Sequence, residues 1–336
     1  KIKNIISEMA KLSSFNELAT PIFESTEVFL KPLGDHSDVV LKEMYTFEDK
    51  NKELLTLRPE YTTSMIRAAI TNNLLSEIPL KIFGIGPMFR RERPQKGRYR
   101  QFNQINFEIL GSNDILADVE LISIADEFLK KILPNCKIKL NINSLGTKKD
   151  LKNYRNKLTK FFNSKKSLLS DDSRKKIDSN PLRILDSKHL EDIEISKQAP
   201  LIYEFLSSEI KNNYEELKNI LKSININFVE NNNLVRGLDY YCSTVFEFKT
   251  SELGSQDTLI GGGRYDGLIG LLGGQDIPGI GWAGGIERIA MLMEYNQKNN
   301  KDVHIAVLDK NYKMHLAKLL EYLKIYKISY FWDFKY

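Results

Sequence analysis

A basic turn followed by a strongly amphipathic strand, in the segment MFRRERPQKGRYRQFNQINFE at residues 88–108, restricts the fold more than any other part of the chain. The sequence PQKG at 94–97 is typical of a turn, so its flanks are expected to pair as an antiparallel hairpin. Side chains alternate between the two faces of a strand. One face of the second strand then carries Gln104, Asn106 and Glu108, and the other carries Ile105, Phe107 and Ile109. The apolar face predicts burial, and the polar face predicts the floor of a pocket.

The charges of this hairpin are divided unevenly between its two halves. The first half and the turn contain one acidic residue, Glu92, and the basic residues Arg90, Arg91, Arg93, Lys96, Arg98 and Arg100. Residues 101–110 contain no basic residue. A pocket with arginines at one end and an amide and a carboxylate deeper inside suits a ligand that carries phosphate and amine groups. The alternative, a hairpin whose charges only face solvent, does not require so amphipathic a second strand.

Length and composition limit the classes of protein to consider. With 336 residues the chain is too long for one ordinary core, which predicts two or three domains. The content of 42% hydrophobic and 28% charged residues is typical of a soluble globular protein. A net charge of +5 is too small for a protein that coats DNA, so any contact with nucleic acid must depend on local basic clusters.

Cysteine and histidine usage argues against a metal site held by the protein. Cys136 and Cys242 are far apart in sequence, which favours free thiols and a reducing, cytoplasmic compartment. The histidines stand singly and form no HExxH, so no protein-bound metal is expected. No apolar run approaches the roughly 18–20 residues that cross a bilayer, so no membrane contact is expected. The chain begins at Lys1, not methionine, and we therefore expect residues before it.

The spacing of apolar residues predicts different secondary structure in different segments of the chain. Amphipathic helices are predicted at 1–13 and 115–133. Strands are predicted at LATPIFE (18–24), 44–57, 81–110 and VFEFKT (245–250), with glycine-rich turns at 260–285. The stretch 150–230, rich in lysine, asparagine and serine, predicts a helical insertion. The tail from residue 302 predicts strand–helix–strand, the start of a small α/β domain.

Four further clusters are TLRPEYTTSMIRA (56–68), LVRGLDYYCSTVFEFKT (234–250), LIGGGRYDGLI (259–269) and GIGWAGGIERIAML (279–292). The last contains GxGxxG at 279–284, but Pro278 precedes it in place of a buried parallel strand, which disfavours a dinucleotide site. No GxxxxGK[ST] occurs, which excludes a P-loop. A strand leading into a helix whose first turn holds Glu287 and Arg288 fits better, because glycines let a ligand approach the backbone and Arg288 can then reach a phosphate.

In this order the motifs resemble those of the histidyl-tRNA synthetases, a family of class II aminoacyl-tRNA synthetases. FRRERPQKGRYRQF is similar to motif 2 of the class, GIGWAGGIERIAML to motif 3, and TPIFESTEVFLKPLGDHSDVVLKEMYTF, with Pro21 at its marker proline, to motif 1. LVRGLDYYCSTVFEF and GGGRYDGL resemble the two signatures that distinguish the histidine family, and NPLRILDSK (180–188) resembles its insertion. The resemblance extends from residue 1 to about residue 300.

The resemblance implies an α+β fold with the antiparallel sheet of class II synthetases, flanked by helices, and a homodimer formed through motif 1. Ile2, Ile5, Met9 and Leu12 of the first helix and the LATPIFE strand would offer apolar surface to the partner. Four segments are implied: the first catalytic part at 1–149 with motifs 1 and 2, a helical insertion at 150–230, the second catalytic part at 231–298, and a partial anticodon-binding α/β domain at 302–336. That last domain stops short of its usual length, so we expect further sequence.

The reaction implied by the resemblance is that of an aminoacyl-tRNA ligase. Histidine and ATP, with Mg²⁺ bound to the ATP, give histidyl-adenylate and pyrophosphate, and the histidine then passes to the 3′ end of its tRNA. Arg90 and Arg236 would be catalytic, because they stabilise charge that builds at the α-phosphate. The residues that would bind ATP are Arg90, Glu92, Arg98, Phe102 and Arg288. No side-chain nucleophile is implied.

The same resemblance assigns the remaining site residues. Histidine would be bound by Glu60, Tyr61, Thr62, Gln104, Glu108, Arg236, Tyr240 and Tyr241. Within this set, Glu60, Thr62 and Gln104 would hold the α-amino group, and Glu108 and Tyr241 the two imidazole nitrogens, with Tyr240 beside them. Such a site rejects amino acids that leave its polar groups unpaired. The loop residues Gln95, Lys96 and Arg100 would contact the tRNA acceptor end.

One departure from the family pattern and two alternatives need testing. Tyr61 stands where the family usually has glycine, and a positive φ at this position would strain a tyrosine. A non-catalytic paralogue, the regulatory subunit of ATP phosphoribosyltransferase, resembles the same fold and binds histidine, but it typically lacks the intact signature RGLDYY. Class II synthetases for glycine, proline or threonine share motifs 1–3 but lack LVRGLDYY together with GGGRYDGL.

Overall fold

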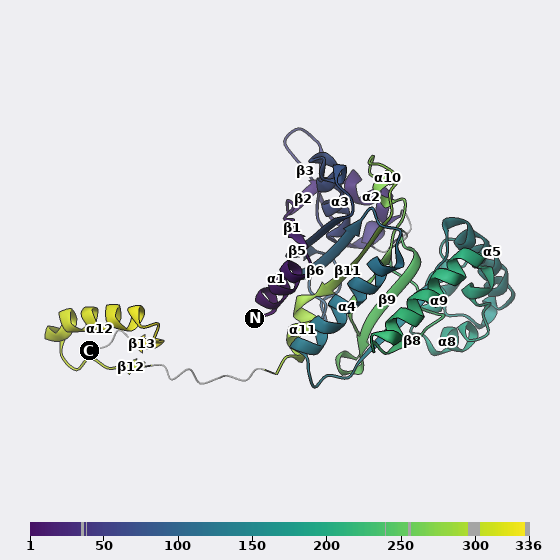
Figure 1. The fold of residues 1–336 in the computed structure, drawn as a ribbon. Helices are drawn as coiled ribbons and strands as arrows, with labels where there is room; N and C mark the ends of the chain where they lie inside the picture. Colours follow the sequence, from purple (N-terminus) through teal and green to yellow (C-terminus); the bar gives the residue numbers. More distant parts are fainter. Residues whose placement is uncertain (35–36, 38, 239, 255–256, 295–302, 333–336) are drawn as a thin grey trace. The chain divides into compact units, whose positions relative to one another are not determined.

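The computed structural model describes residues 1–34, 37, 39–238, 240–254, 257–294 and 303–332, which form two compact units, residues 1–293 and 294–336. The first unit is built on an eight-stranded sheet flanked by helices (Figure 1), which confirms the predicted α+β fold class. In spatial order the strands are β1 (Asn16–Glu17), β5 (Leu80–Phe89), β6 (Gln101–Leu110), β11 (Gly279–Gly285), β10 (Thr258–Arg264), β9 (Cys242–Thr250), β7 (Ile138–Ser144) and β8 (Phe228–Glu230). The pairs β1–β5 and β7–β8 are parallel, and the pairs between β5 and β7 are antiparallel.

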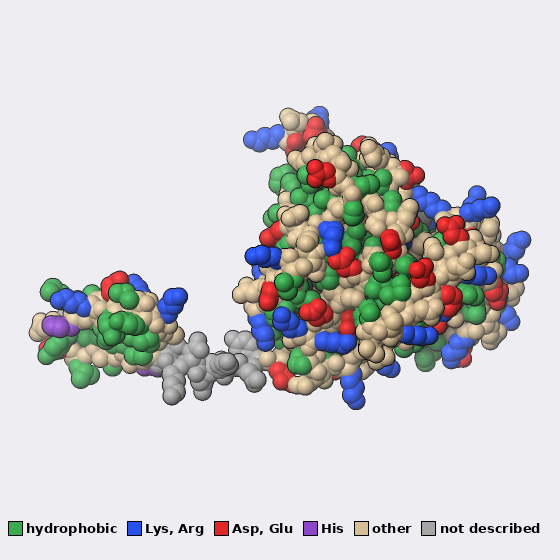
Figure 2. All heavy atoms as spheres, in the orientation of Figure 1, with side chains coloured by type: hydrophobic (Ala, Val, Ile, Leu, Met, Phe, Trp, Pro, Cys, Tyr) green, Lys and Arg blue, Asp and Glu red, His purple; other side chains and the backbone are tan. Residues whose placement is uncertain are grey.

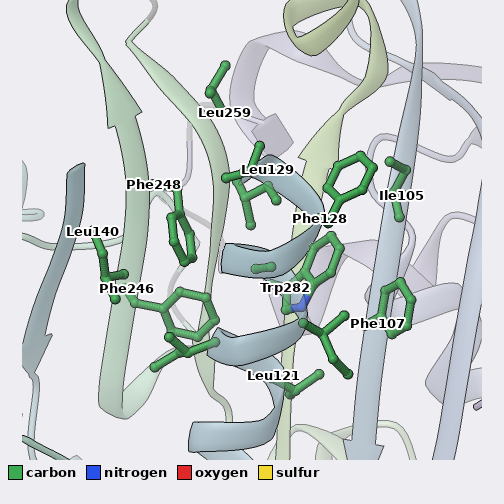
Figure 3. Packing of buried hydrophobic residues seen from close by; sticks show 14 of the residues in the cluster. Ile105, Phe107, Leu121, Phe128, Leu129, Leu140, Phe246, Phe248, Leu259 and Trp282 are labelled. Carbon is green, nitrogen blue, oxygen red and sulfur yellow. The ribbon is translucent and has the colours of Figure 1, made fainter. Parts of the chain in front are cut away.

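One face of this sheet is buried against α1 (Ile2–Leu12), α4 (Ile115–Ile132) and α9 (Ser208–Ser223), with the core between them (Figure 3). Phe107 of β6 stacks on Trp282 of β11 with ring centroids 4.8 Å apart and on Phe83 of β5 at 5.5 Å. Burying one such aromatic side chain contributes about 1.5–3 kcal/mol. The structure thus confirms the helices predicted at 1–13 and 115–133, and it places the apolar face of the predicted second hairpin strand in the core.

A smaller three-stranded sheet lies beside the main one, in the order β2 (Phe23–Ser25), β4 (Leu54–Leu57) and β3 (Tyr45–Glu48). Helices α2 (Glu27–Leu33), α3 (Thr62–Thr71) and α10 (Leu268–Leu271) contribute to a second hydrophobic core. The strands predicted within 44–57 are confirmed. The strand predicted over LATPIFE was placed too early, because Arg58 donates to the carbonyls of Thr20 and Pro21 and regular pairing begins only at Phe23.

The region predicted as a helical insertion contains α5 (Lys148–Ser164), α6 (Asp171–Lys176), α7 (Leu182–Leu185), α8 (Leu190–Ser196) and α9. Helix α5 begins with a capping box, in which Thr147 and Asp150 satisfy each other's backbone N–H groups. The last two elements of the predicted insertion, α9 and β8, belong to the main sheet region, since α9 packs on α4 and β8 pairs with β7. The exact division into catalytic parts and insertion remains a proposal.

The segment 260–285 was predicted to hold glycine-rich turns, and that prediction was wrong at both ends, although turns occur around Gly267 and Gly273. It contains strands β10 and β11, followed by α11 (Ile286–Leu292), as predicted for the strand and helix around 279–292. Short helical turns occur at Val39–Glu43, Leu74–Ser76, Lys166–Leu168, Ile202–Phe205, Ser251–Leu253 and Lys310–Tyr312. The glycines of β10 leave no room for a Cβ, because the Arg236 guanidinium lies beside Gly261 and backbone carbonyls lie beside Gly262 and Gly263.

The second unit is a small α/β segment. Strands β12 (Val303–Ile305) and β13 (Tyr330–Trp332) pair in parallel and are connected by α12 (Lys313–Ile325), which confirms the strand–helix–strand prediction.

Positive and negative side chains are intermixed over the face shown in Figure 2, as expected for a small net charge. Over the described residues, every helix is too short or too polar to span a bilayer.

Candidate active site

The predicted hairpin is present and is continued beyond the regular strands. Its turn is closed by two hydrogen bonds, from the Gln95 N–H to the Arg98 carbonyl at 3.2 Å and from the Arg98 N–H to the Gln95 carbonyl at 2.9 Å. Gly97 has φ +76°, a left-handed conformation that glycine adopts without steric cost. The Arg90 N–H donates to the Arg100 carbonyl at 2.9 Å. Of the basic residues in the hairpin, Arg90 and Arg98 point into the cavity that lies in front of β6.

A cavity of about 170 Å³ opens at this point. The predicted site residues that line it are Glu60, Thr62, Arg90, Glu92, Arg98, Phe102, Gln104, Arg236, Tyr240, Tyr241 and Arg288. Residues that were not assigned from the sequence also line it, among them Leu238, Thr258, Gly261 and Glu287. Segments that are up to 228 residues apart in sequence, from Glu60 to Arg288, thus converge on one hollow.

Two arginines of the hairpin face the cavity from fixed positions. The Arg90 Nε donates to the Pro59 carbonyl at 2.8 Å, and the guanidinium carbon lies 5.4 Å from the centre of the Phe102 ring. Arg98 forms an ion pair with Glu92, with Nε and Oε2 3.0 Å apart. Because one carboxylate and one ring hold these two cations, their orientation is set before a ligand arrives.

Arg288 approaches from the first turn of α11. Its Nε donates to the Gly97 carbonyl at 2.8 Å and its Nη1 to the Thr258 carbonyl at 3.0 Å. Burial and the neighbouring Arg98 cation lower its pKa. Beside it, Glu287 accepts from the backbone N–H of Asn103, at 2.9 Å to Oε2, and from the Asn103 side-chain amide at 2.8 Å. The loop and α11 are therefore tied together around a region of excess positive charge that suits an anion.

Arg236 enters from the loop between β8 and β9. It pairs with Glu247, which also accepts from Lys249 at 2.9 Å. Burial alone would lower the pKa of Arg236, but the Glu247 carboxylate together with Tyr241 and Tyr240 outweighs burial and raises the pKa, which favours the charged guanidinium. The guanidinium lies against Gly261, where a Cβ would be 2.5 Å from Nη1, and its carbon is 5.3 Å from the Tyr241 ring centre. This contact explains a glycine in the middle of β10.

Glu60 lies in front of α3 and binds its first turn. Its carboxylate accepts from the backbone N–H groups of Thr62 at 2.9 Å and Thr63 at 2.8 Å, and from the Thr63 hydroxyl. Burial raises its pKa, while the hydrogen bonds from Thr63 act in the opposite direction. A carboxylate held in this way faces the cavity in one fixed orientation.

Tyr61 was predicted to contact histidine, and the structure places its side chain elsewhere. The ring is buried behind the cavity, with its hydroxyl donating to the Leu18 carbonyl at 3.3 Å and the Arg58 guanidinium 4.2 Å from its centre. The backbone φ of Tyr61 is −99°, so the strain expected for a tyrosine with positive φ does not arise. Tyrosine fits here because Gly84 and Gly86 on β5 leave room for the ring.

Glu108 was predicted to contact the imidazole directly, yet it does not line the cavity and is fully buried beneath it. Oε1 accepts from the Thr62 hydroxyl at 2.7 Å and Oε2 from the Tyr265 hydroxyl at 2.5 Å. Burial raises the pKa of Glu108 to about 8, against the effect of these two hydrogen bonds. A Cβ on Gly281 would lie 1.5 Å from Oε2, so the GxGxxG glycine makes room for this carboxylate.

Tyr265 is the functional candidate that sequence reasoning missed, although it lies within the quoted signature GGGRYDGL. Its ring centre is 5.8 Å from that of Tyr240, and the rings of Tyr240 and Tyr241 are 4.6 Å apart. Gln104 adds a buried Oε1 atom that has no hydrogen-bond partner among the described residues. An unpaired buried acceptor that lines a cavity indicates a donor on the ligand.

The remaining predicted residues, Gln95, Lys96 and Arg100, are exposed on the hairpin loop and do not line the cavity. Their position fits a larger ligand that approaches from outside. Within the described part of the chain, no group of three or more His, Cys, Asp and Glu side chains is arranged to hold a metal ion.

Comparisons with known proteins agree with one another. A sequence profile described as Histidyl-tRNA synthetase matches residues 1–289. Histidine--tRNA ligase of Ehrlichia canis is 46% identical over 99% of this chain and 80% of its own. The crystal structure of apo S. aureus histidyl-tRNA synthetase is similar with a TM-score of 0.77 and 32% identity, over 100% of this chain and 80% of that one. A Bacillus halodurans structure titled ATP phosphoribosyltransferase regulatory subunit/histidyl-tRNA synthetase has a TM-score of 0.71 but 18% identity, over 98% and 87%, so it shares the fold alone. With its profile match and its motifs in one cavity, the chain belongs to the histidyl-tRNA synthetase family.

Proposed function

We propose that this protein attaches L-histidine to its tRNA in an ATP-dependent reaction through a histidyl-adenylate intermediate. The observation that carries the proposal is a single cavity lined by Arg90, Arg98, Arg236 and Arg288 on one side and by Gln104 with its neighbours on the other. Four guanidinium groups suit a triphosphate, and the polar floor suits an amino acid. The protein is accordingly an aminoacyl-tRNA ligase.

In the first step the histidine carboxylate attacks the α-phosphorus of ATP, the bond to the bridging oxygen breaks, and pyrophosphate leaves with its electron pair. Positioned positive charge matters more here than covalent help from the protein. Arg90 and Arg236 would stabilise the α-phosphate, and the buried Arg236 Nε has no hydrogen-bond partner among the described residues. Arg98 and Arg288 would bind the outer phosphates.

Mg²⁺ would enter with ATP. It prefers octahedral oxygen coordination and is usually held by phosphates, water and one or two carboxylates. Glu92 and Glu287 are the carboxylates beside the arginines of the cavity that fit this requirement. Bound Mg²⁺ would neutralise charge on the outer phosphates, while the arginines orient them.

At the other end, Glu60 and Gln104 would hold the α-ammonium group, and Tyr240 and Tyr241 would enclose the imidazole. Glu108 would act from beneath the cavity, through direct contact after a small adjustment or through the hydroxyls of Thr62 and Tyr265 that it binds. This arrangement favours a ligand that carries both an ammonium group and ring N–H donors.

The direct test is histidine-dependent exchange of pyrophosphate into ATP, measured without tRNA. We expect exchange with histidine and none with glycine, proline or threonine. A non-catalytic histidine-binding paralogue would bind histidine and show no exchange, and that result would overturn the proposal. The high identity to a named ligase and the intact Arg236 loop support the catalytic reading.

The exposed loop residues make a separate prediction about tRNA. Lys96→Ala is expected to slow histidine transfer to tRNA and to lower the salt dependence of that step, because each lost phosphate contact reduces the salt slope by about one. Pyrophosphate exchange should stay within a few-fold of normal, since Lys96 does not line the cavity. Transfer kinetics at several salt concentrations, beside exchange rates, provide the measurement.

Lys50→Ala is the matched control, because Lys50 is an exposed lysine in the turn between β3 and β4. It should leave both activities and the salt slope unchanged. If Lys96→Ala reduces exchange and transfer equally, the loop serves ATP and its assignment to tRNA is wrong.

A homodimer is also proposed. Its interface is expected on the small three-stranded sheet and not on the buried face of α1. Ile2 and Met9 of α1 are buried in the subunit's own core, so they are not available to a partner. The small sheet offers apolar surface instead: Phe23, 53% exposed, and Phe47, 44% exposed, pair with Leu57 and Leu55 of β4 and so lie on the same face. Two exposed aromatic side chains on one face of a small sheet are typical of an interaction surface.

Sedimentation of the protein should therefore show a dimer at micromolar concentration. Phe23→Asp should shift it toward monomer, because the introduced charge would be desolvated at the contact. Leu190→Asp is the control, since Leu190 is 79% exposed on the distant α8. A wild-type monomer, or equal dissociation by both substitutions, would count against this interface.

A cytoplasmic location is the last part of the proposal. Cys136 and Cys242 are both free thiols, and burial raises the pKa of Cys242 to about 12, which keeps it in the unreactive thiol form. Free thiols of this kind suit a reducing compartment.

A further inference from the structure

The short helix α7, in the helical region, contacts the loop that carries the catalytic arginine. Arg183 of α7 donates from Nη2 to the Gly237 carbonyl at 2.8 Å, and Gly237 directly follows Arg236. The two residues are 54 positions apart in sequence, so only the fold brings them together. This contact is outside the cavity that binds the substrates in the proposed function, because Arg183 does not line it.

The fit between the two partners is close. A Cβ on Gly237 would lie 3.3 Å from both Nη1 and Nη2 of Arg183, so the guanidinium rests on the bare backbone of the glycine. Both ends of the contact are anchored in one hydrophobic core, which includes Ile184 on the α7 side and Val235 on the loop side. An arginine held by α7 therefore fixes the backbone at the base of the Arg236 side chain.

The same region encloses a second cavity, of about 340 Å³, next to the first. Arg183, Asp186 and Lys188 line it together with Arg90 and Arg236. The segment 180–188 thus lies close to the catalytic arginines, although its apolar residues pack in the core. Its charged residues face a cavity that the catalytic side chains share.

We propose that Arg183 is a positioning residue for Arg236, acting through the Gly237 carbonyl. This inference rests on the proposed function, in which Arg236 stabilises the α-phosphate. Glu247 and Gly261 fix the tip of the Arg236 side chain, whereas Arg183 fixes its base. A preorganised cation needs both, because displacement of about 1 Å in a reacting group can cost about 100-fold in rate.

Arg183→Gln is the informative substitution. We expect the rate of histidyl-adenylate formation to fall about 10- to 100-fold, with the melting temperature little changed, since Arg183 is only part-buried and the apolar residues of α7 that pack in the core are kept. Arg183→Lys retains a donor but not the flat guanidinium, so it should restore part of the rate. Arg174→Gln is the matched control, because Arg174 also donates to backbone carbonyls, those of Lys166 and Ser167, in the same helical region. It should leave the rate unchanged.

A double-mutant cycle separates positioning from a structural role. In an Arg236→Ala background, Arg183→Gln should cause less than a twofold further loss in single-turnover adenylate formation, because the residue it positions is already gone. A structural role predicts the opposite: equal losses in both backgrounds, or a loss accounted for by the unfolded fraction. Either result would overturn the inference. If the wild-type protein shows no histidine-dependent exchange, the proposed function itself fails, whereas normal exchange with an unaffected Arg183→Gln variant refutes only the positioning role.

Discussion

Replacing Arg236 by alanine is expected to slow histidine-dependent pyrophosphate exchange by about 100- to 1000-fold, the usual cost of removing one preorganised donor from a developing charge. The reason is local: Arg236 is part-buried, its pKa is raised by Glu247 and the nearby tyrosines, and Glu247 and Gly261 hold it at the cavity wall. Lysine at this position should recover little of the rate, because it lacks the planar fork of arginine. Exchange at saturating histidine and ATP, with melting curves alongside, provides the measurement.

The fold should survive this substitution because Glu247 is not left without a partner. Lys249 remains 2.9 Å from its other carboxylate oxygen, which limits the cost of a buried charge. Arg67→Ala is the matched control, since Arg67 also pairs with a carboxylate, that of Glu24, but does not line the cavity. It should reduce stability without the catalytic loss. Exchange that stays near wild type in Arg236→Ala would remove the catalytic role.

The hairpin and its two faces could be predicted from sequence because both depend on local rules. A Pro–Gly turn fixes the pairing, and strand alternation assigns Gln104 and Glu108 to one face and Phe107 to the other. The helices at 1–13 and 115–133 and the strand–helix–strand tail could be predicted for the same reason, from the periodicity of their apolar residues. The convergence of Arg90 and Arg288 could not be derived from periodicity, and it followed only from the family resemblance.

The features that could not be predicted from the sequence depend on contacts between segments that are distant along the chain. Glycines usually mark turns, yet Gly261 lies mid-strand because the Arg236 guanidinium occupies the space of its side chain. Tyr61 was assigned by its place in a motif, but room on β5 lets its ring turn away from the cavity. Tyr265 was overlooked because nothing local shows that its hydroxyl reaches Glu108, 157 positions earlier. In each case the deciding partner is remote in sequence.

Glu108→Gln is expected to weaken histidine binding about 10- to 100-fold while leaving ATP binding within twofold, because one charge-assisted hydrogen bond contributes about 1.5–3 kcal/mol. The amide fits the same space and can bond the hydroxyls of Thr62 and Tyr265, so the pocket should keep its shape. Calorimetric titration with each ligand alone provides the measurement. Glu120→Gln is the control, since Glu120 is 37% exposed on α4. Equal losses for histidine and ATP would make Glu108 a structural residue.

Glu108→Gln is expected to weaken histidine binding but to stabilise the empty protein at high pH. Burial raises the pKa of Glu108 from 4.5 to about 8, so the folded protein binds a proton that the unfolded chain has released between these pH values. Ionising the buried group therefore costs the wild-type protein stability as pH rises through this window, by at most about 1.4 kcal/mol per pH unit. Glutamine has no such cost, so the melting temperature of Glu108→Gln relative to wild type should rise from pH 5 to pH 8. Bound histidine favours the ionised carboxylate by donating an N–H to it. The affinity of the wild type relative to that of the variant should therefore rise with pH, while titration of the free histidine imidazole affects both proteins alike. If the variant loses both histidine affinity and stability relative to the wild type as the pH rises from 5 to 8, the proposed role of Glu108 is wrong. A buried carboxylate that is kept in order to bind the ligand costs stability when the site is empty, so removing it should stabilise the empty protein.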